Sequence, residues 1–108
     1  MGCGCTEDKY TWNGTGLKYA VRMDCEGFDM NEDDWIIVIT CGDKSVTFSP
    51  ENAVYNDSEN QWYICINTEE LGPGELYITF EAHVPDEDFP VGYRREIQKY
   101  RLVKIKNL

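Results

Sequence analysis

Apolar and polar residues alternate with a period of two along most of this chain, and no segment repeats its apolar side chains with a helical period. The alternation is clearest over residues 76–84 and recurs over residues 17–25. Residues 35–41 are apolar on both faces, which is typical of a strand inside a sheet. A period of two places alternate side chains on opposite faces of a strand. The pattern therefore excludes a helical bundle and predicts an all-β fold.

Turn-forming residues divide the chain into about seven strands. Clusters rich in Gly, Pro, Asn and Asp stand at residues 42–44, 56–60, 72–74 and 85–92. Strands that recur every 8–12 residues predict an antiparallel immunoglobulin-like β-sandwich, with a small barrel as the alternative. The Cys…Trp…Cys spacing of antibody domains is absent, so the prediction concerns the architecture and not that family.

The two ends of the chain differ from its middle. We expect an irregular N-terminal arm over residues 1–16, followed by a sandwich domain over residues 17–108 that ends in a basic strand. Within the expected last strand, residues 97–105, the apolar parity changes after Leu102. A change of parity indicates either a β-bulge, because one extra residue moves the following side chains to the other face, or a strand with apolar residues on both faces.

Charge is divided unevenly along the chain. Its 108 residues carry 20 acidic and 10 basic side chains, a formal net charge of -10. Residues 1–93 hold 19 of the acidic and 4 of the basic side chains, whereas residues 94–108 hold 6 basic side chains and only one acidic one. Because phosphate binding needs clustered Lys and Arg, the acidic excess argues against nucleic acid as the main partner, and likewise against an anionic membrane.

The basic segment has two interpretations. It pairs with the acidic body as an ordinary last strand, or it docks on an acidic neighbour, including another copy of the same body. The candidate partner-binding residues are Arg94, Arg95, Lys99, Arg101, Lys104 and Lys106.

No pattern typical of catalysis is found. His83 is the only imidazole and falls on the polar face of the strand expected over residues 76–84. No serine lies in a Gly-x-Ser-x-Gly elbow, and no glycine-rich phosphate loop precedes a helix. We therefore predict a protein that is not an enzyme and uses no cofactor.

One acidic segment partly matches a calcium loop. Asp29, Asn31 and Asp33 have the Asp-x-Asn-x-Asp spacing of its first half. The loop then requires Gly and Glu, where this chain has Asp34 and Thr40. We therefore predict no metal centre and keep the three residues only as weak candidates.

Five cysteines without an apolar leader sequence indicate a reducing compartment, and we expect Cys25, Cys41 and Cys65 to be buried and unpaired. Residues 1–6 (Met-Gly-Cys-Gly-Cys-Thr) fit an N-myristoylation pattern with two adjacent palmitoylation sites. An acylated, membrane-associated protein is therefore one alternative, although no apolar run is long enough to span a bilayer.

Aromatic residues suggest a second alternative. Tyr10, Trp12 and Tyr55 fall in or near expected loops, where they would stack on a sugar ring, or they cover the rim of the core. Trp35 and Trp62 are expected in the core.

Turn and strand motifs in the second half resemble those of small β-sandwich proteins of tailed phages and prophages of gut bacteria, including crAss-like phages. The motifs are residues 42–48 (Gly-Asp-Lys-Ser-Val-Thr-Phe), Trp62, residues 71–76 (Leu-Gly-Pro-Gly-Glu-Leu) and residues 85–94 (Pro-Asp-Glu-Asp-Phe-Pro-Val-Gly-Tyr-Arg). They cover about half the chain, and Val91 departs from the polar residue that we expect in the last of them.

The resemblance implies a non-enzymatic structural protein of a virion, made in the cytoplasm of a bacterial host. An auxiliary (decoration) capsid protein bound to the shell is the first expectation, and a tail baseplate or fibre component or a carbohydrate-binding adhesin module is the alternative. The expected partners are other virion proteins, namely the major capsid protein or tail proteins, and further copies of the chain.

Overall fold

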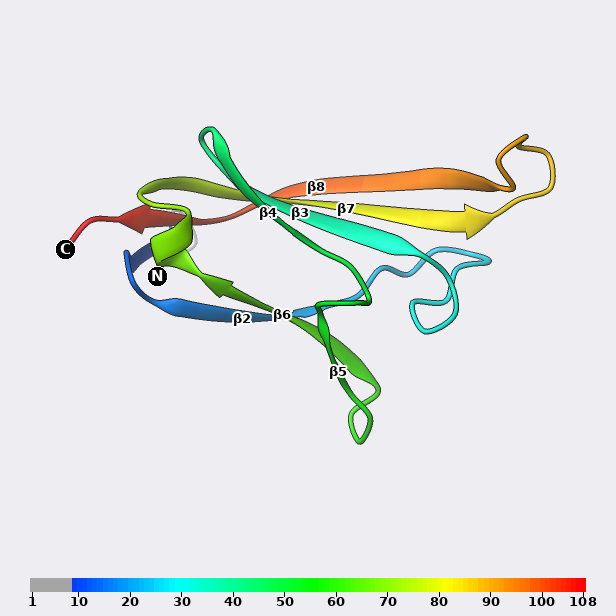
Figure 1. Ribbon diagram of the computed structural model, residues 1–108, viewed down its shortest axis with the longest axis horizontal. Coiled ribbons are helices and arrows are strands. Elements are labelled where there is room, and N and C mark those ends of the chain that lie inside the picture. The colour runs from blue at the N-terminus through cyan, green and yellow to red at the C-terminus, as the bar shows by residue number, and fades with distance from the viewer. Residues whose placement is uncertain (1–8) are drawn as a thin grey trace, which may run out of the picture.

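The computed structural model describes residues 9–108 and consists of two β-sheets packed together, with no α-helix in that range (Figure 1). One sheet has five strands in the order β1-β8-β7-β3-β4, and the other has three in the order β2-β6-β5. The strands are β1 (Tyr10–Trp12), β2 (Gly16–Val21), β3 (Trp35–Cys41), β4 (Lys44–Phe48), β5 (Val54–Asn56), β6 (Gln61–Asn67), β7 (Gly74–Pro85) and β8 (Tyr93–Lys106), and a short 3-10 helix, η1 (Thr68–Glu70), follows β6. The all-β prediction is confirmed, as is the packing of two layers.

The structure differs from the sequence-based expectation at the N-terminal arm. Residues 10–12 lie within the segment expected to be irregular, yet they form β1. This strand pairs with β8 in parallel, with Tyr10 opposite Lys104 and Trp12 opposite Lys106. The sheet is therefore mixed and not purely antiparallel. A strand of three residues gives too short an alternation to be recognised, and its pairing joins opposite ends of the chain.

The core lies between the sheets and is built on the period-two pattern of β7. Its inward residues Leu76, Ile78, Phe80, Ala82 and Val84 are all buried, as predicted. β7 pairs with β3 on one side and with β8 on the other. From β3, Trp35 packs edge-on against Trp62 with ring centroids 5.2 Å apart. Aromatic pairs in this geometry add to the stabilisation that comes from apolar burial.

The predicted irregularity in the last strand is present. Leu76 lies opposite Val103, but the next residue, Tyr77, lies opposite Arg101, so Leu102 is the extra residue on β8. Before the bulge, the even-numbered residues of β8 face inward, whereas after it the odd-numbered residues do. The bulge therefore allows Val103 and Ile105 to face the core.

Thr68 connects the turn between β1 and β2 to η1. It is fully buried, and its hydroxyl donates to the carbonyl of Thr15 at 2.9 Å and accepts from the Gly14 amide at 2.8 Å. Both hydrogen-bonding roles of the hydroxyl are thus used, as a buried polar group requires.

The expectation for the three central cysteines is only partly correct. Cys41 is buried, and burial raises the pKa of its thiol. Cys25 is half-buried, and Cys65 is exposed. Cys65 stands between the buried Ile64 and Ile66 of β6 and therefore points to the outer face of the three-stranded sheet. The expectation of burial is wrong for Cys65, because no further layer covers that face.

Replacing Ile39 by alanine should lower the free energy of unfolding by about 3 kcal/mol, because this fully buried side chain of β3 leaves a cavity. Urea denaturation monitored by tryptophan fluorescence measures the change. Ile97→Ala removes the same atoms from an exposed site on β8 and should change stability by less than about 0.5 kcal/mol. Equal losses in the two variants would contradict this assignment of the core.

Candidate functional site

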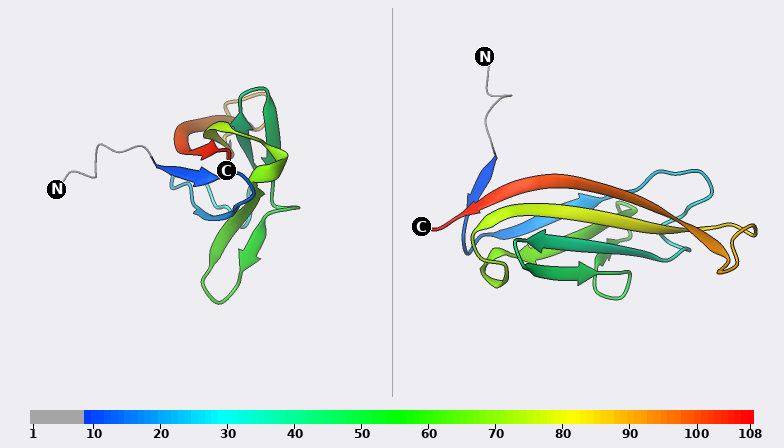
Figure 2. Two further views of the ribbon diagram at one scale, coloured as in Figure 1. Left: turned by 90° about the vertical axis from the view of Figure 1, so that its left-hand side faces the viewer. Right: turned by 90° about the horizontal axis from the view of Figure 1, so that it is seen from above.

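The candidate site is the outer side of β8, the strand that carries all six candidate partner-binding residues. Seen from above in the right-hand view of Figure 2, β8 runs along the border of the five-stranded sheet, and β1 meets only its C-terminal end. The pairing with β1 covers residues 104–106. Among residues 9–108, no strand pairs with the outer side of residues 93–103, which we call the open edge.

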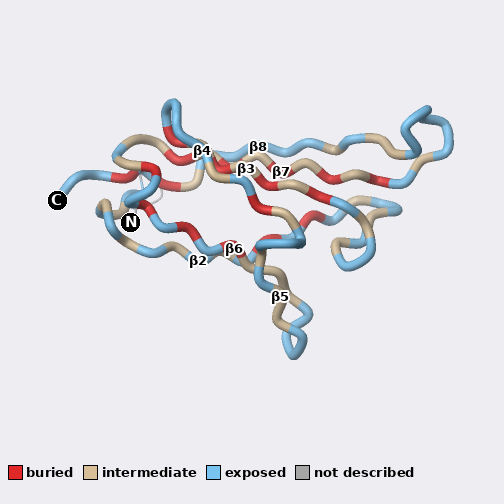
Figure 3. The backbone as a smooth tube through the Cα atoms, in the orientation of Figure 1, coloured by how far each residue is buried: buried red, intermediate tan, exposed pale blue. Residues whose placement is uncertain are grey.

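The open edge offers unpaired backbone groups. In an antiparallel pair, alternate residues direct their N–H and C=O groups toward one neighbour or the other. Along residues 93–103, β8 forms backbone hydrogen bonds to β7 on one side only. Every second residue therefore directs its N–H and C=O groups away from β7, toward the open edge. Figure 3 shows that most of β8 is exposed, in contrast to β7. Natural proteins usually cover or charge such an edge, and this one is charged.

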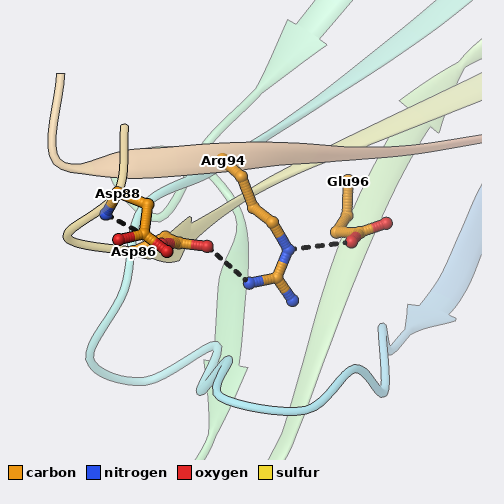
Figure 4. Close-up of polar contacts among 4 residues, drawn as sticks. All are labelled: Asp86, Asp88, Arg94 and Glu96. Atoms are coloured by element: carbon orange, nitrogen blue, oxygen red, sulfur yellow. Dashed lines mark hydrogen bonds and ion pairs between the residues drawn. The ribbon is translucent and has the colours of Figure 1, made fainter. Parts of the chain in front are cut away.

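Arg94 links the strand to the loop before it. Its Nη1 lies 3.3 Å from Oδ2 of Asp86, and its Nε lies 3.1 Å from Oε1 of Glu96 (Figure 4). The hydrogen bond to Glu96 is the main cause of the raised pKa of the Arg94 guanidinium, which stays charged. Figure 4 also shows Asp86 accepting from the amide of Asp88. Arg94 therefore fixes the base of the loop over residues 86–92, which we call the hairpin tip.

Arg95 and Lys99 lie on the face of the sheet that points away from the second sheet, because their β7 partners are His83 and Thr79 and not the buried residues of that strand. Arg95 Nη1 lies 3.6 Å from Oε1 of Glu81. The ammonium of Lys99 lies 5.4 Å from the centre of the Tyr77 ring. Both side chains are exposed and available to a partner that approaches this face.

The other three basic residues lie near the C-terminal end of β8. Arg101 pairs with Glu75 at 3.4 Å, and Lys104 is the register partner of the same glutamate. Lys106 places its ammonium 4.1 Å from the centre of the Tyr10 ring, a cation–π contact. Three of the six basic residues, Arg94, Arg95 and Arg101, thus form ion pairs with acidic residues of the body or of β8 itself. The geometry agrees with an ordinary last strand, and docking on an acidic neighbour stays a prediction.

The weak metal candidates are engaged in other contacts. Asp29 accepts from the Asn31 amide, and Asp33 accepts from the Asp29 amide, both at 2.9 Å. The Asn31 side chain accepts from Nε1 of Trp62 at 2.8 Å and donates to Asn60 at 3.2 Å. Within the described range, no group of three or more His, Cys, Asp or Glu side chains is placed to hold a metal ion. Asn31 holds the loop between β2 and β3 against the hairpin of β5 and β6.

His83 is held by its strand neighbours. Its Nε2 lies 2.7 Å from Oε2 of Glu81, and its ring stacks on Tyr93 with centroids 4.3 Å apart. These contacts agree with the position on the polar face of a strand that the sequence indicated for His83.

The aromatic candidates for sugar binding are divided between two places. Tyr10 and Trp12 are exposed on β1, in edge-to-face contact at 5.5 Å. Tyr55 lies on β5 and packs on Trp62 at 5.0 Å. The three rings therefore do not form one stacking surface.

Sequence analysis missed the exposed apolar residues that accompany the basic ones. Ile97 and Tyr100 are half exposed on β8, and Phe89 and Val91 are exposed in the hairpin tip. In the sequence, Val91 differs only in replacing the polar residue expected in that loop.

Comparison with protein-family models, with curated proteins and with solved structures finds no match for this chain. No helix in the described part of the chain is long and apolar enough to cross a membrane. The acylation pattern in residues 1–6 lies outside the described residues.

Arg94→Gln should loosen the hairpin tip, because it removes the ion pairs to Asp86 and Glu96. We expect the amide of Asp86, which donates to the carbonyl of Gly92 at 3.0 Å, to exchange with deuterium about three- to tenfold faster. NMR-detected hydrogen exchange measures this rate. Arg22→Gln, which removes an exposed pair with Asp24, should leave it unchanged. An unaltered rate in the Arg94 variant would show that the ion pairs do not hold the tip.

Proposed function

We propose that this protein is a non-enzymatic structural component of a tailed-phage virion that binds the capsid shell as an auxiliary protein. The observation that carries the proposal is the open edge of β8, which combines unpaired backbone groups with exposed basic side chains. An extended segment of a shell protein would add to this edge through main-chain hydrogen bonds, the mode of recognition known as β-strand addition. The turn and strand motifs of residues 42–94 supply the link to phages.

Charge supports this mode of attachment. Arg95 and Lys99 are exposed beside the open edge, so an acidic partner would gain contacts there that a basic one would not. Each contact of this kind is weak when exposed. On a symmetric shell, many copies bind at once, and occupancy is then set by the sum of many small contributions.

We further propose that the sandwich is of immunoglobulin-like type. In a variable-type immunoglobulin domain, one sheet contains the strand order G-F-C-C′ and the other contains B-E-D. When β1 to β8 are lettered A, B, C, C′, D, E, F and G along the chain, the order β8-β7-β3-β4 becomes G-F-C-C′ and the order β2-β6-β5 becomes B-E-D. β1 is then an extra first strand beside β8. Trp35 supports the same assignment, because it is buried on β3, which corresponds to the strand that carries the buried tryptophan of immunoglobulin domains.

The proposed function is tested by the double substitution Arg95→Gln and Lys99→Gln, which removes two positive charges beside the open edge. When the variant replaces the natural chain in the phage or prophage that encodes it, we expect about a tenfold lower amount in purified particles. Quantitative mass spectrometry of separated capsids and tails measures the amount and the location.

The matched control removes two charges elsewhere, by Arg22→Gln and Lys44→Gln, and should be incorporated fully. A natural chain absent from purified particles would overturn the proposed function. Full incorporation of the Arg95 and Lys99 variant would overturn the role of the basic edge. If the natural chain is recovered with separated tails and not with capsids, the protein attaches to the tail and not to the shell.

A further inference from the structure

We propose that the open edge selects one kind of extended segment, in which an acidic, an apolar and a second acidic residue occupy alternate positions. The apolar residue lies opposite Ile97, and the acidic residues lie opposite Arg95 and Lys99. The backbone of the segment continues the five-stranded sheet, and its alternate side chains give the specificity. This inference rests on the proposed function, because it names the chemistry of the shell segment that the open edge binds.

Backbone hydrogen bonds show which residues of β8 offer unpaired groups. In an antiparallel ladder, the N–H and C=O groups of a residue point to the same side, and the side alternates along the strand. The amide of His83 donates to the carbonyl of Asp34 at 3.0 Å, on the β3 side of β7. The backbone groups of His83 therefore point away from β8, and those of its register partner Arg95 point away from β7. By alternation, Ile97 and Lys99 also direct their N–H and C=O groups to the open edge.

A second hydrogen bond, on the other side of the bulge, agrees with this assignment. The amide of Lys104 donates to the carbonyl of Lys9 at 3.1 Å, on the β1 side of β8. Lys104 is the register partner of Glu75, which lies on the same face of β7 as His83. Residues of β8 on that face therefore direct their backbone groups outward both before and after the bulge. The open edge continues the side of β8 to which β1 is already added.

The same residues also carry the side chains that a partner strand meets. Arg95, Ile97 and Lys99 point to the face of the sheet that lies away from the second sheet, and Ile97 is 54% exposed between the two cations. In an added strand, residues directly opposite place their side chains on the same face, where opposite charges and apolar pairs stabilise the pairing. The favoured order is therefore acidic, apolar, acidic at alternate positions. Because the two cations stand symmetrically about Ile97, this order is the same for either strand direction.

Both cations keep donors for a partner. Arg95 lies 3.6 Å from Glu81, but its side chain is 61% exposed and its guanidinium has several N–H groups, so it can pair with a second carboxylate. Lys99 lies 5.4 Å above the centre of the Tyr77 ring, and a contact with the ring face leaves donors of the ammonium for a carboxylate. An acidic segment therefore adds contacts to those already made within the chain.

The sequence and the charges indicate that the occupant is another protein and not a second copy of this chain. Asp29 and Asp33 are the one pair of acidic residues with the required spacing, and the polar Asn31 stands between them. No segment of the chain therefore has the acidic, apolar, acidic order. Two β8 strands paired antiparallel about Ile97 would place Arg95 of one copy opposite Lys99 of the other. Like charges directly opposite each other destabilise a strand pair.

Two peptides of identical composition test the inference in solution. The first, acetyl-Thr-Asp-Thr-Ile-Thr-Asp-Thr-amide, carries the pattern. The second, acetyl-Thr-Asp-Thr-Ile-Asp-Thr-Thr-amide, moves one aspartate to the other face of the strand, so that only one of its carboxylates can meet a cation of the outer face. NMR titration of the isotope-labelled natural chain measures both affinities. We expect a dissociation constant of about 1 mM for the first peptide and about fivefold weaker binding of the second.

Hydrogen exchange locates the bound peptide. With the first peptide at about ten times its dissociation constant, the outward amides of Arg95, Ile97 and Lys99 should exchange about tenfold more slowly. The amides of Glu96 and Gln98 point toward β7 and should be unaffected by the peptide. An ion pair formed without strand addition would not produce this alternation.

The double variant Arg95→Gln and Lys99→Gln should bind the first peptide about tenfold more weakly, because both charge contacts are lost. Arg22→Gln with Lys44→Gln removes the same number of charges elsewhere and should bind it like the natural chain. Circular dichroism confirms that both variants are folded.

Three results would overturn the inference: equal affinity for the two peptides, no binding of the first at about 10 mM, or binding without slower exchange of the outward amides. The proposed function is tested separately. Incorporation into particles that depends on Arg95 and Lys99, together with equal affinity for both peptides, would overturn this inference alone. Selective binding of the first peptide by a chain that is absent from purified particles would overturn the proposed function and leave the selectivity of the open edge intact.

Discussion

The ladder between β7 and β8 is the interaction on which the other features of the structure depend. β7 buries every inward side chain from Leu76 to Val84 in the core, and its two sides pair with β3 and β8. β8 itself buries only Val103 and Ile105, after the bulge at Leu102. The N-terminal two thirds of β8 is therefore attached to the domain by its pairing with β7 and not by burial of its own side chains.

Unequal layers explain why β8 is available to partners. Five strands face three, so the larger sheet extends beyond the smaller one, and the basic strand lies on that extension. One consequence is the open edge, where β1 covers only residues 104–106. The proposed attachment through the open edge therefore follows from this feature of the architecture and needs no catalytic group.

Sequence analysis could recover what local patterns encode. The alternation from Leu76 to Val84 identified a strand and its buried face, and the change of parity at Leu102 indicated the bulge as one of two alternatives. It could not recover contacts between distant segments. Asn31 matched a calcium pattern in its neighbourhood, whereas its side chain is bonded to Trp62, 31 residues away. For the same reason β1 was missed, and Cys65 was assigned to the core when it faces outward from a sheet with no further layer.

The central claim is that residues 93–103 of β8 are paired on one side only. Residue-resolved hydrogen exchange of the natural chain at micromolar concentration tests it directly by NMR. Amides of β8 that point toward β7 should exchange slowly and those that point outward should exchange fast, so that protection alternates from residue to residue between Arg94 and Arg101. Continuous protection along this stretch would mean that a second strand covers the edge, and absence of protection would mean that the ladder with β7 is not formed. Either result would contradict the account.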